Sequence, residues 1–547
     1  MRLGVDFARP ASRLFALLVA LARGTNAAAQ SDSPAAPTVA AVRADAPPVI
    51  DGQLDDPVWS RVVPVTDFWT FRPMDDRPAT ERTEAYLAYD SENLYVGFRA
   101  YEAHPGQVRA SLANRDAPFA DDLVAVFLDT FGDGRRAYLL FANPLGVQAD
   151  GVTTEGGSDD YSVDLVWTSA GRRTEDGFVV EMAIPFRSLR FHAREETRWG
   201  IAFFRVVQHA SEQQVFPRVD VDRNCLLCQM AVLTGLRDLR TGLRAEFLPT
   251  VTGTRRGVVD AATDRFAMAA PEVDAGLGAK LVPGPNWVLD LAFNPDFSQV
   301  ETDASQVEVN QRFALFFPEK RPFFQEGIEI FQTPLPFVYT RTIFDPLVAA
   351  KLSAKWGRTT VGAVGAVDET PIVPLGESVA EGEASPDRDA WIGIVRVKRD
   401  VGESSSVGAL VTDRRFGASF NRVVGVDAQW RFARTWEFTG QAAWTDTRGL
   451  DGVRRSDPAL TFELARRGEH AFLGASYDDL GPDVRAHVGF VRRVDLRQGR
   501  LWVGFQERPG RAVLKRWQAK ASYRRLYDHG GVLQDEEVRP GIFVHLA

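Results

Sequence analysis

Cys225 and Cys228 are the only cysteines, and they stand in the segment Cys-Leu-Leu-Cys. A pair at this spacing can form a local disulfide, supply part of a zinc site or act as a redox dithiol. Two thiolates cannot close a tetrahedral zinc site, and no histidine stands nearby at ligand spacing. A redox pair would need a βαβ context, which is not predicted around these residues. For an exported chain we therefore predict a structural disulfide between Cys225 and Cys228.

Aspartates in predicted turns offer carboxylate oxygens, which are the ligands that calcium prefers. They are Asp121, Asp122, Asp129, Asp133, Asp159 and Asp160. None of them matches the spacing of a defined calcium loop, so we interpret them as solvated acidic turns. We predict no cofactor and no metal site, with a structural calcium ion as the alternative.

Enzyme motifs are not found in the sequence. It has no Gly-x-Ser-x-Gly elbow, no His-Glu-x-x-His and no phosphate-binding loop. Two carboxylates flanking a glycosidic bond would make a glycosidase, but spacing does not tell which carboxylates converge. We predict no catalytic residue. The 73 acidic and 64 basic residues, net charge −9, give no reason to expect nucleic acid as a partner.

The N-terminus has the order of a secretory signal peptide. Arg2, Arg9 and Arg13 precede an apolar run from Leu14 to Ala22, and three alanines follow at residues 27–29. We predict a signal peptide at residues 1–29, a linker at 30–45 and export of the chain. A buried N-terminal helix is the alternative, and the Pro/Ala/Ser composition of residues 31–37 disfavours it.

Residues 46–240 show short apolar strands separated by Asp/Asn/Gly/Pro turns, as in a β-sandwich. The predicted strands are Thr83–Tyr89, Leu94–Tyr101, Leu123–Thr130, Arg136–Ala142, Val163–Ala170, Gly177–Ile184 and Gly200–Val207. The run Val124–Leu128 is apolar at every position, which predicts burial on both faces. The charged tip from Asp129 to Gly134 is predicted to face solvent.

Residues 241–547 follow a different pattern, in which apolar residues alternate with polar or small ones. The strongest example is Val424–Thr445, where two alternating segments flank a short turn and carry tryptophans near their ends. Alternation with terminal aromatics is typical of a membrane-spanning β-hairpin. Further predicted strands are Trp287–Phe293, Ala349–Trp356, Thr359–Val367, Trp391–Lys398, Ser406–Asp413, His470–Tyr477, Arg485–Val491 and Arg500–Gln506, with a loop at Pro371–Asp389. We predict an antiparallel transmembrane β-barrel; a second soluble sandwich is the alternative.

Two stretches near the start of the predicted sandwich carry a family resemblance. Val49–Trp59 contains Asp-Gly-Gln-Leu-Asp-Asp-Pro-Val-Trp, and Ala88–Gly97 contains Tyr-Asp followed by Leu-Tyr-Val. They resemble the opening of a family 9 carbohydrate-binding module. The similarity continues through Asp122–Thr130 and Gly177–Phe191 and covers most of residues 46–200. It implies a jelly-roll-like sandwich, and so an all-β protein.

A second resemblance lies in Phe293–Glu301 and in Phe316–Gly327, which reads Phe-Phe-Pro-Glu-Lys-Arg-Pro-Phe-Phe-Gln-Glu-Gly. Both are similar to the signature of bacterial proteins that fuse such a module to an outer-membrane β-barrel of unknown function. This resemblance covers essentially the whole mature chain. It implies the outer membrane of a Gram-negative-type bacterium, with outer-membrane lipid and the barrel-assembly machinery as partners. We expect Glu319 and its charged neighbours to form ion pairs at the barrel rim or in the lumen, because charges facing lipid are penalised.

The first resemblance implies sugar binding, which needs aromatic faces for a pyranose and planar groups for its hydroxyls. The candidate aromatic residues are Trp69 and Trp167, with Phe119 and Tyr161 as weaker choices. The candidate polar residues are Arg115, Asp116, Asn143 and Gln148. For Trp167, packing in the core is an equal alternative, and Trp59 is predicted to be a core residue.

We expect an outer-membrane protein that binds or passes a glycan or related ligand at the cell envelope without catalysis. One alternative is a hydrolase of O-glycosyl bonds in carbohydrate catabolism, and another is a structural envelope protein without sugar binding. The chain ends at Gly541–Ala547 without a terminal aromatic residue. This predicts a truncated or partial barrel, whose open edge would favour aggregation.

Overall fold

The computed structural model describes residues 36–546 except for 74–76, 158, 162, 192–195, 241–243, 256, 261–264, 269, 285, 296–314, 370–388, 403 and 509–513. Several of the segments discussed above lie outside the described residues. They are the predicted signal peptide, the first part of the linker, most of the loop at Pro371–Asp389, and Asp296–Glu301 of the second signature. Residues 37–547 form one compact unit. Among the described residues, no helix is long and apolar enough to cross a membrane.

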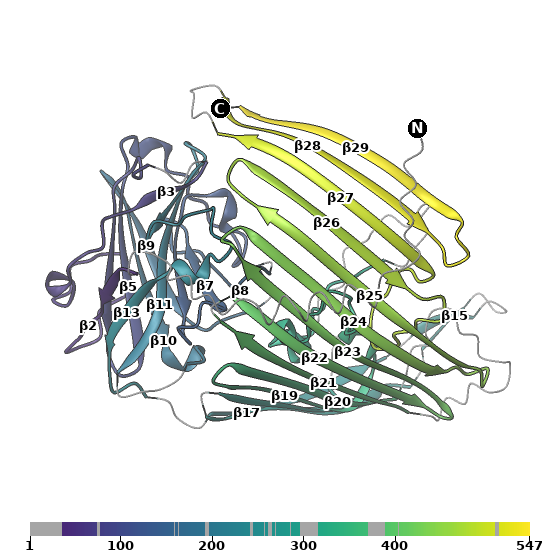
Figure 1. Cartoon of the computed structure of the whole chain (residues 1–547). Helices are drawn as coiled ribbons and strands as arrows, with labels where there is room; N and C mark the ends of the chain where they lie inside the picture. The colour runs from purple at the N-terminus through teal and green to yellow at the C-terminus, as the bar shows by residue number, and fades with distance from the viewer. Residues whose placement is uncertain are drawn as a thin grey trace, which may run out of the picture. The chain divides into compact units, whose positions relative to one another are not determined.

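The first part of this unit is a β-sandwich of two sheets (Figure 1). Sheet A contains β1 (Thr38–Ala40), β3 (Trp69–Arg72), β6 (Leu123–Asp129), β7 (Arg136–Ala142), β8 (Gln148–Thr154), β11 (Thr197–Val207), β12 (Glu212–Phe216) and β13 (Ala231–Leu236). Sheet B contains β2 (Val42–Arg43), β4 (Thr83–Tyr89), β5 (Asn93–Tyr101), β9 (Thr168–Thr174) and β10 (Gly177–Pro185). Short helical turns connect them: η1 (Trp59–Arg61), η2 (Pro105–Gln107), η3 (Pro118–Ala120), η4 (Phe186–Ser188) and η5 (Leu227–Gln229).

The main core lies between sheets A and B. In β6, Val124, Val126 and Leu128 enter this core, whereas Ala125 and Phe127 join a second apolar cluster on the opposite face of sheet A. The prediction that the run Val124–Leu128 is buried on both faces is therefore confirmed.

The strand predicted at Val163–Ala170 is wrong in its first half, because β9 begins only at Thr168. Leu165 is buried without strand pairing. Its N–H donates to the carboxylate of Asp150 at 2.5 Å, and its carbonyl accepts from Arg115 at 2.6 Å. Side chains thus satisfy the backbone groups that a neighbouring strand would otherwise satisfy.

The Asp51-Gly52-Gln53 turn is held by one buried carboxylate on β10. The three backbone N–H groups donate to Oε2 of Glu181 at 2.9–3.2 Å, and the indole of Trp59 donates to its Oε1 at 3.0 Å. Gly52 has φ +83°, a conformation that favours glycine. Burial raises the pKa of Glu181. Trp59 is a buried core residue, as predicted.

The prediction that the acidic tip from Asp129 to Gly134 faces solvent is wrong for Asp129. This carboxylate is 2% exposed and accepts the N–H groups of Phe131, Gly132 and Gly134. Burial, reinforced by the neighbouring charge of Asp133, raises the pKa of Asp129 to about 6. The residue closes the β6–β7 turn from within, because its oxygens replace water as acceptors for the turn's N–H groups.

The second part of the unit is a 14-stranded antiparallel sheet in the described residues, called the long sheet. It contains β14 (Arg244–Thr254), β17 (Glu272–Gly284), β18 (Trp287–Phe293), β19 (Pro346–Trp356), β20 (Thr359–Asp368), β21 (Ala390–Val401), β22 (Ser405–Phe416), β23 (Ser419–Phe432), β24 (Trp436–Arg448), β25 (Arg454–Arg467), β26 (Ala471–Leu480), β27 (Leu496–Glu507), β28 (Leu514–Tyr527) and β29 (Leu533–Leu546). A separate hairpin joins β15 (Gly257–Asp260) to β16 (Arg265–Met268). The all-β fold class, with a sandwich followed by a long antiparallel sheet, is confirmed.

The hairpin predicted at Val424–Thr445 is present as β23 and β24, closed by Phe432 opposite Trp436. Its apolar face is exposed: Val424 and Val426 are 55% and 58% exposed. The alternate residues Asn421 and Val423 are fully buried on the other face. The period-two pattern of the sequence therefore separates an apolar outer face from a covered inner face.

Two segments cover the inner face of the long sheet, namely residues 315–345 and 481–495, which we call the inner segments. The first contains α2 (Pro322–Gln325), η6 (Ile328–Phe331) and η7 (Thr340–Thr342). Phe324, Phe337 and Val488 of these segments share one buried cluster with strand residues such as Val423 and Leu410. The inner face is therefore packed like a protein core.

The strand predicted at Arg485–Val491 is wrong, because these residues belong to the second inner segment. Val488 accepts the N–H of Tyr339 at 2.7 Å, and the carbonyl of Arg485 accepts from the amide of Asn421 at 3.0 Å. The alternation that suggested a strand instead reflects packing onto the inner face. In the first inner segment, Arg321 pairs with Glu319 at 2.8 Å, as expected for the charged part of the signature.

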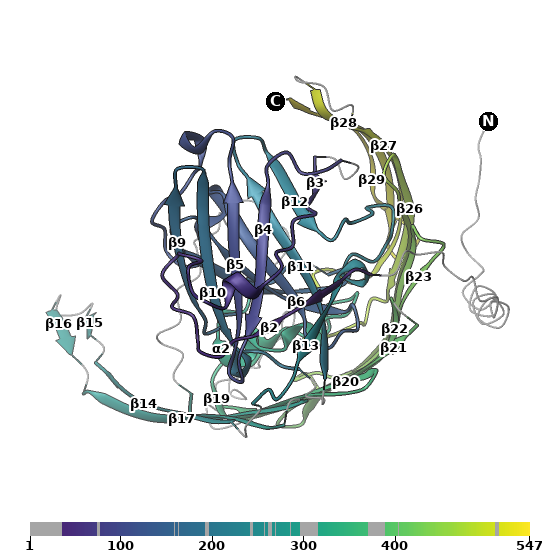
Figure 2. The same ribbon diagram turned by 90° about the vertical axis from the view of Figure 1, so that its left-hand side faces the viewer.

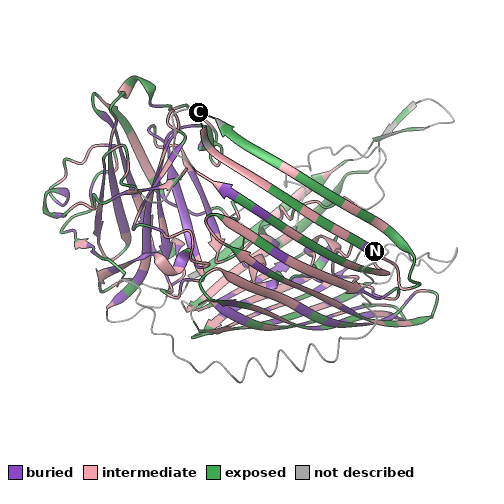
Figure 3. Ribbon diagram, turned by 45° about the horizontal axis from the view of Figure 1, so that its top comes forward, coloured by how far each residue is buried: buried purple, intermediate pink, exposed green. Residues whose placement is uncertain are grey.

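The long sheet is open between its first and last strands in the described part. β14 pairs only with β17, and β29 pairs only with β28. Figure 2 shows the sheet as an arc with these strands at its two ends. Most side chains of β29 are exposed, as the green C-terminal strand of Figure 3 shows.

Candidate functional site

Aromatic rings cross the face of sheet A that points away from the sandwich core. They are Phe71 on β3, Phe204 on β11, Phe127 on β6, Phe141 on β7, and Phe119 and Tyr161 beside them, and we call this set the aromatic row. Neighbouring rings lie with their centroids 6.0, 4.1, 5.7, 5.6 and 5.1 Å apart in that order. Phe119 and Tyr161 are each 39% exposed at one end. This exposed end of the row offers apolar ring faces and edges to a flat ligand.

Register explains why these rings share a face. Phe204 on β11 pairs with Ala125, two residues before Phe127 on β6, so both phenylalanines project from the same side. Tyr161 lies beside Gly151 of β8, where a Cβ atom would meet the tyrosine ring at 3.1 Å. A glycine at this position therefore gives Tyr161 room on the edge strand.

Trp69 stands at the other end of this face. Trp69 pairs with Val215 of β12, which in turn pairs with Phe204 of β11. The side chain of Trp69 is half-buried. The guanidinium of Arg218 lies over its ring at 4.7 Å from the centroid. The guanidinium of Arg72 lies in the same way 5.4 Å from the ring of Phe71.

Four of the six predicted sugar-binding residues lie together at the edge of β8, away from Trp69. Arg115 donates to Gln148 at 2.6 Å and pairs with Asp150. Gln148 donates to the carbonyl of Trp167 at 3.1 Å, and Asp116 accepts the N–H of Asp150 at 3.2 Å. This cluster ties the chain around residues 163–169 to β8.

The structure places Trp167 in the main core at 6% exposure, where its indole donates to Asp150 at 3.3 Å. Asn143 is fully buried. Its amide donates to Asp121 at 2.9 Å, and its oxygen accepts the N–H groups of Leu145 and Val147. Both side chains thus serve internal contacts, and of the predicted aromatic pair only Trp69 reaches the surface of sheet A.

Two groups of side chains with potential metal-ligand atoms lie close enough to share a cation. Carboxylate oxygens of Asp116, Asp150 and Asp164 lie within 4.8 Å of one another, and so do ligand atoms of Glu81, Glu102 and His209. Arg115 contacts all three aspartates of the first group, which places a guanidinium where a cation would neutralise them.

Burial governs the protonation of the first acidic group. It raises the pKa of Asp150, against the lowering effect of the Leu165 N–H and of Arg115. It also raises the pKa of Asp116. A carboxylate whose pKa is raised by burial requires a partner charge when it ionises, and Arg115 supplies that charge.

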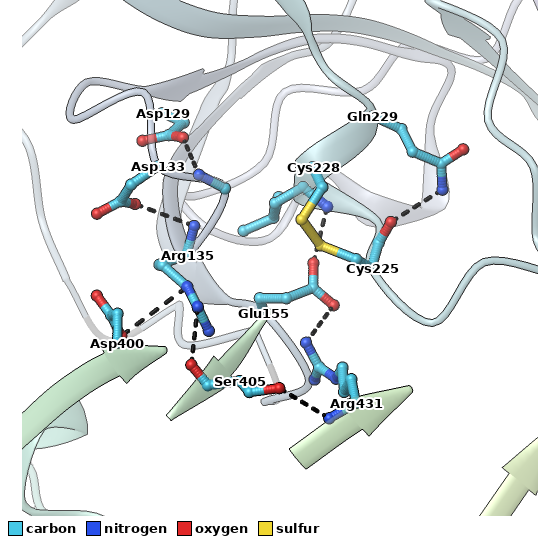
Figure 4. Close-up of a disulfide and its surroundings, with 12 residues drawn as sticks. Asp129, Asp133, Arg135, Glu155, Cys225, Cys228, Gln229, Asp400, Ser405 and Arg431 are labelled. Carbon is cyan, nitrogen blue, oxygen red and sulfur yellow. Dashed lines mark hydrogen bonds and ion pairs between the residues drawn. A yellow bond between two sulfur atoms is a disulfide. The ribbon is translucent and has the colours of Figure 1, made fainter. Parts of the chain in front are cut away.

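Glu155, which follows β8, connects the sandwich to the long sheet (Figure 4). It pairs with Arg431 of β23 at 3.1 Å, and both side chains are almost fully buried. It also accepts the N–H of Leu227 at 2.7 Å, inside the Cys225–Cys228 disulfide loop. Burial raises the pKa of Glu155.

Other sandwich residues contact the same end of the long sheet. Arg135 donates to the carbonyl of Ser405 at 2.8 Å, and Asn224 donates to that of Trp436 at 2.6 Å. Further contacts join Asp133 to Lys355, Asp220 to Arg434 and Asp222 to Glu469. These partners flank the β19–β20, β21–β22, β23–β24 and β25–β26 turns, which have only two or three residues between strand ends.

The inner segments also contact the sandwich. Arg190 pairs with Glu326, which in turn pairs with Lys280 of β17. Arg136 lies 3.3 Å from Glu329. The sandwich, the first inner segment and the long sheet are therefore linked by a continuous set of charged side chains.

Sequence reasoning missed four rings of the aromatic row, namely Phe71, Phe127, Phe141 and Phe204. Their strands were predicted in part, but the apolar runs did not tell which residues face the core. The usable signal was the side-chain period of two within β6 and β11, combined with the large size of the residues on one face.

Two family models match this chain. Residues 50–215 match the model described as carbohydrate family 9 binding domain-like, and residues 242–349 match a domain of unknown function, DUF5916. The two-part organisation expected from the sequence resemblances is confirmed. No curated protein matches the chain.

Solved structures with similarity to the chain fall into two groups. A family 9 carbohydrate binding module from Caldicellulosiruptor kristjanssonii, in complex with cellotriose, is 18% identical with a TM-score of 0.26, covering 38% of this chain and 94% of that chain. An anion-selective porin from Comamonas acidovorans is 12% identical with a TM-score of 0.26, covering 77% and 92%. Pseudomonas aeruginosa OccK2, in complex with glucuronate, is 8% identical with a TM-score of 0.25, covering 76% and 83%.

Proposed function

We propose that this chain is an outer-membrane protein that binds a glycan on the aromatic row of its sandwich and holds it near one end of the long sheet, without catalysis. The aromatic row, with Phe119 and Tyr161 exposed at one end, carries the proposal. The family 9 match over residues 50–215 agrees with it.

The chemistry of the row suits a sugar. A pyranose has apolar faces built from C–H groups and a rim of hydroxyls, so aromatic rings stabilise the faces while polar groups bind the rim. Phe119 and Tyr161 supply exposed rings, and the Tyr161 hydroxyl lies 3.2 Å from Asp159, which adds polar atoms at the same place.

The long sheet supports the location in the outer membrane. Its outward face is apolar along β23 and β24, which is the face that lipid requires of a membrane-spanning strand. In such barrels the short turns face the periplasm and the longer loops face outside. The sandwich contacts the end of the long sheet at which neighbouring strands are joined by turns of two or three residues. We therefore place the sandwich in the periplasm. The proposal includes the signal peptide at residues 1–29 and a division between sandwich and barrel near residue 240.

Glycan binding by the full chain in detergent micelles tests the function. We expect binding to at least one glycan class on an array, and a loss of about tenfold or more in affinity for the double variant Phe119→Ala/Tyr161→Ala, equivalent to about 1.4 kcal/mol. Tyr101→Ala is the matched control, because Tyr101 lies on the outer side of sheet B between Arg82 and Arg99. Absence of binding to any glycan would support a structural envelope protein, and turnover of a bound glycan would support the hydrolase.

Protease treatment of intact cells tests the placement. We expect a tag inserted at the exposed residue Val63 of the sandwich to be protected in intact cells and cleaved after the outer membrane is permeabilised. Cleavage in intact cells would place the sandwich outside. Recovery of the protein in the soluble fraction would overturn the membrane assignment.

A further inference from the structure

We infer that the Trp69 end of the aromatic row selects glycans that carry carboxylates, so that the preferred ligand is an acidic oligosaccharide built with uronic acids. This inference rests on the proposed function and names the ligand class of the same surface. Two guanidinium groups stacked on outward-facing rings carry it.

Arg72 and Arg218 occupy matching positions on neighbouring rings. Arg218 covers Trp69 and Arg72 covers Phe71, two residues further along β3 on the same face. Both arginines are exposed. Each of these two rings therefore has an exposed guanidinium group over it, whereas Phe119 and Tyr161 expose their apolar rings at the other end.

Neither Arg72 nor Arg218 has a carboxylate partner in the described part of the chain. Two acidic residues of β12 and the following loop have other partners. Glu212 accepts from Thr80 at 3.0 Å and from Gln214 at 2.9 Å, and Asp220 pairs with Arg434 at 2.6 Å. In the described part of the chain, the two guanidinium charges are thus available to a ligand.

Further positive charge comes from the long sheet. Arg516 of β28 lies within electrostatic range of Arg72 and of Arg508. Guanidinium groups that lie near one another create a positive field, which attracts an anion and strengthens each contact to it.

The geometry favours a carboxylate over other anions. A guanidinium offers two parallel N–H groups that match the two oxygens of a carboxylate, and stacking on a ring holds its plane in place. A uronic acid places that carboxylate at the edge of a pyranose whose faces remain apolar. An oligosaccharide that spans this face would contact the arginines at one end and the exposed rings of Phe119 and Tyr161 at the other.

Arg82 and Arg99 on sheet B provide the internal comparison. Each lies 4.9 Å from the ring centroid of Tyr101, so the stacking is the same. Their charges are engaged, however, because Arg82 pairs with Glu84 at 2.5 Å and Arg99 pairs with Asp176 at 3.1 Å. These carboxylates neutralise the two arginines on sheet B, whereas the stacked arginines on β3 and after β12 lack such partners in the described residues.

Titration of the full chain in micelles with three matched oligosaccharides tests the inference. The probes are an oligogalacturonate, the same oligosaccharide with its carboxyl groups reduced to alcohols, and a sulfated oligosaccharide of equal length. We expect the oligogalacturonate to bind at least about tenfold more tightly than the reduced form, and we expect this preference to weaken with added salt. The variant Arg72→Gln/Arg218→Gln should lose the preference and keep its binding to the reduced form. Arg82→Gln/Arg99→Gln should retain the preference.

The outcomes separate the two proposals. Equal binding of acidic and reduced probes would overturn the inference and leave glycan binding standing. Tighter binding of the sulfated probe than of the oligogalacturonate would overturn the carboxylate assignment. Failure of the chain to bind these probes and every glycan on the array would overturn the proposed function itself.

Discussion

Arg396 of β21 and Asp427 of β23 form a two-point ion pair across the strand that separates them, with N–O distances of 2.5 and 2.8 Å. The guanidinium passes over Gly408 of β22, where any Cβ atom would overlap it. Arg396 is 1% exposed. This pair therefore fastens three strands of the long sheet on their inner face, and a glycine makes it possible.

Substitution of Gly408 should break this pair. Gly408→Ala forces the buried guanidinium of Arg396 away from its partner, and separating a buried ion pair costs about 3–5 kcal/mol. We expect a lower temperature for the heat-induced gel shift of the folded barrel. Gly393→Ala on β21 is the matched control, because a Cβ atom there meets nothing within 4 Å. An equal shift in both variants would contradict the role of the pair.

Substitution of Gly156 should also be destabilising, because this residue lies at the junction between the sandwich and the long sheet. It has φ +78°, and a Cβ atom at this position would overlap the guanidinium of Arg431. Gly156→Ala should therefore displace Arg431 from Glu155 and destabilise the junction by about 3 kcal/mol or more, from backbone strain and the broken pair together.

Release of the sandwich by limited proteolysis measures this effect. We expect faster release from Gly156→Ala than from the unsubstituted chain. Gly106→Ala should leave the rate of release unchanged, because a Cβ atom at this position of the sandwich meets nothing within 4 Å. If the two variants were cleaved at the same rate, the Glu155–Arg431 pair would not hold the junction.

The stability of the sandwich should depend on pH through Asp129. Burial, with the nearby charge of Asp133, raises the pKa of Asp129 from 3.8 to about 6. Between roughly pH 4 and pH 6 the folded protein then binds more protons than the unfolded chain, so this group lowers stability as the pH rises through that window. Asp129→Asn should remove this decline. Urea unfolding at pH 4, 5, 6 and 7 measures the slope.

A second variant tests whether the charge of Asp133 contributes to the raised pKa of Asp129. Asp133→Asn removes the like charge beside Asp129, so the decline should move to lower pH. An unchanged slope in Asp129→Asn would show that other carboxylates, such as Glu181 with its raised pKa, govern this part of the pH profile.

Charge on the outer face of β23 should prevent membrane assembly. Val426 is 58% exposed, and its strand neighbours Val424 and Trp430 are also exposed apolar residues. If this face contacts lipid, Val426→Lys costs about 2–4 kcal/mol near the middle of the bilayer. We expect less folded protein in the outer-membrane fraction. Thr439→Lys, on the inner face of β24, is the control, and equal losses would argue against lipid contact at Val426.

The sequence by itself determined the local pattern of both halves. Continuous apolar residues at Val124–Leu128 indicated a strand buried on both faces, and alternation over Val424–Thr445 indicated a hairpin with one apolar face. Both predictions hold because side-chain direction along a strand is a local property with period two. The Asp-Gly turn before Trp59 carried the family resemblance as a local motif, whereas the carboxylate that binds its N–H groups belongs to Glu181, 129 residues beyond Gly52.

Only the tertiary structure decided which of these residues meet. Arg485–Val491 alternates like a strand, but it packs on the inner face because Asn421 and Tyr339 bind its backbone. Trp167 and Asn143 are the right residue types for a sugar site, and long-range contacts bury both. Phe71, Phe204 and Phe127 form one row only through the pairing of strands far apart in the chain. Register between such strands depends on the whole sheet, so a single sequence contains no local signal for it.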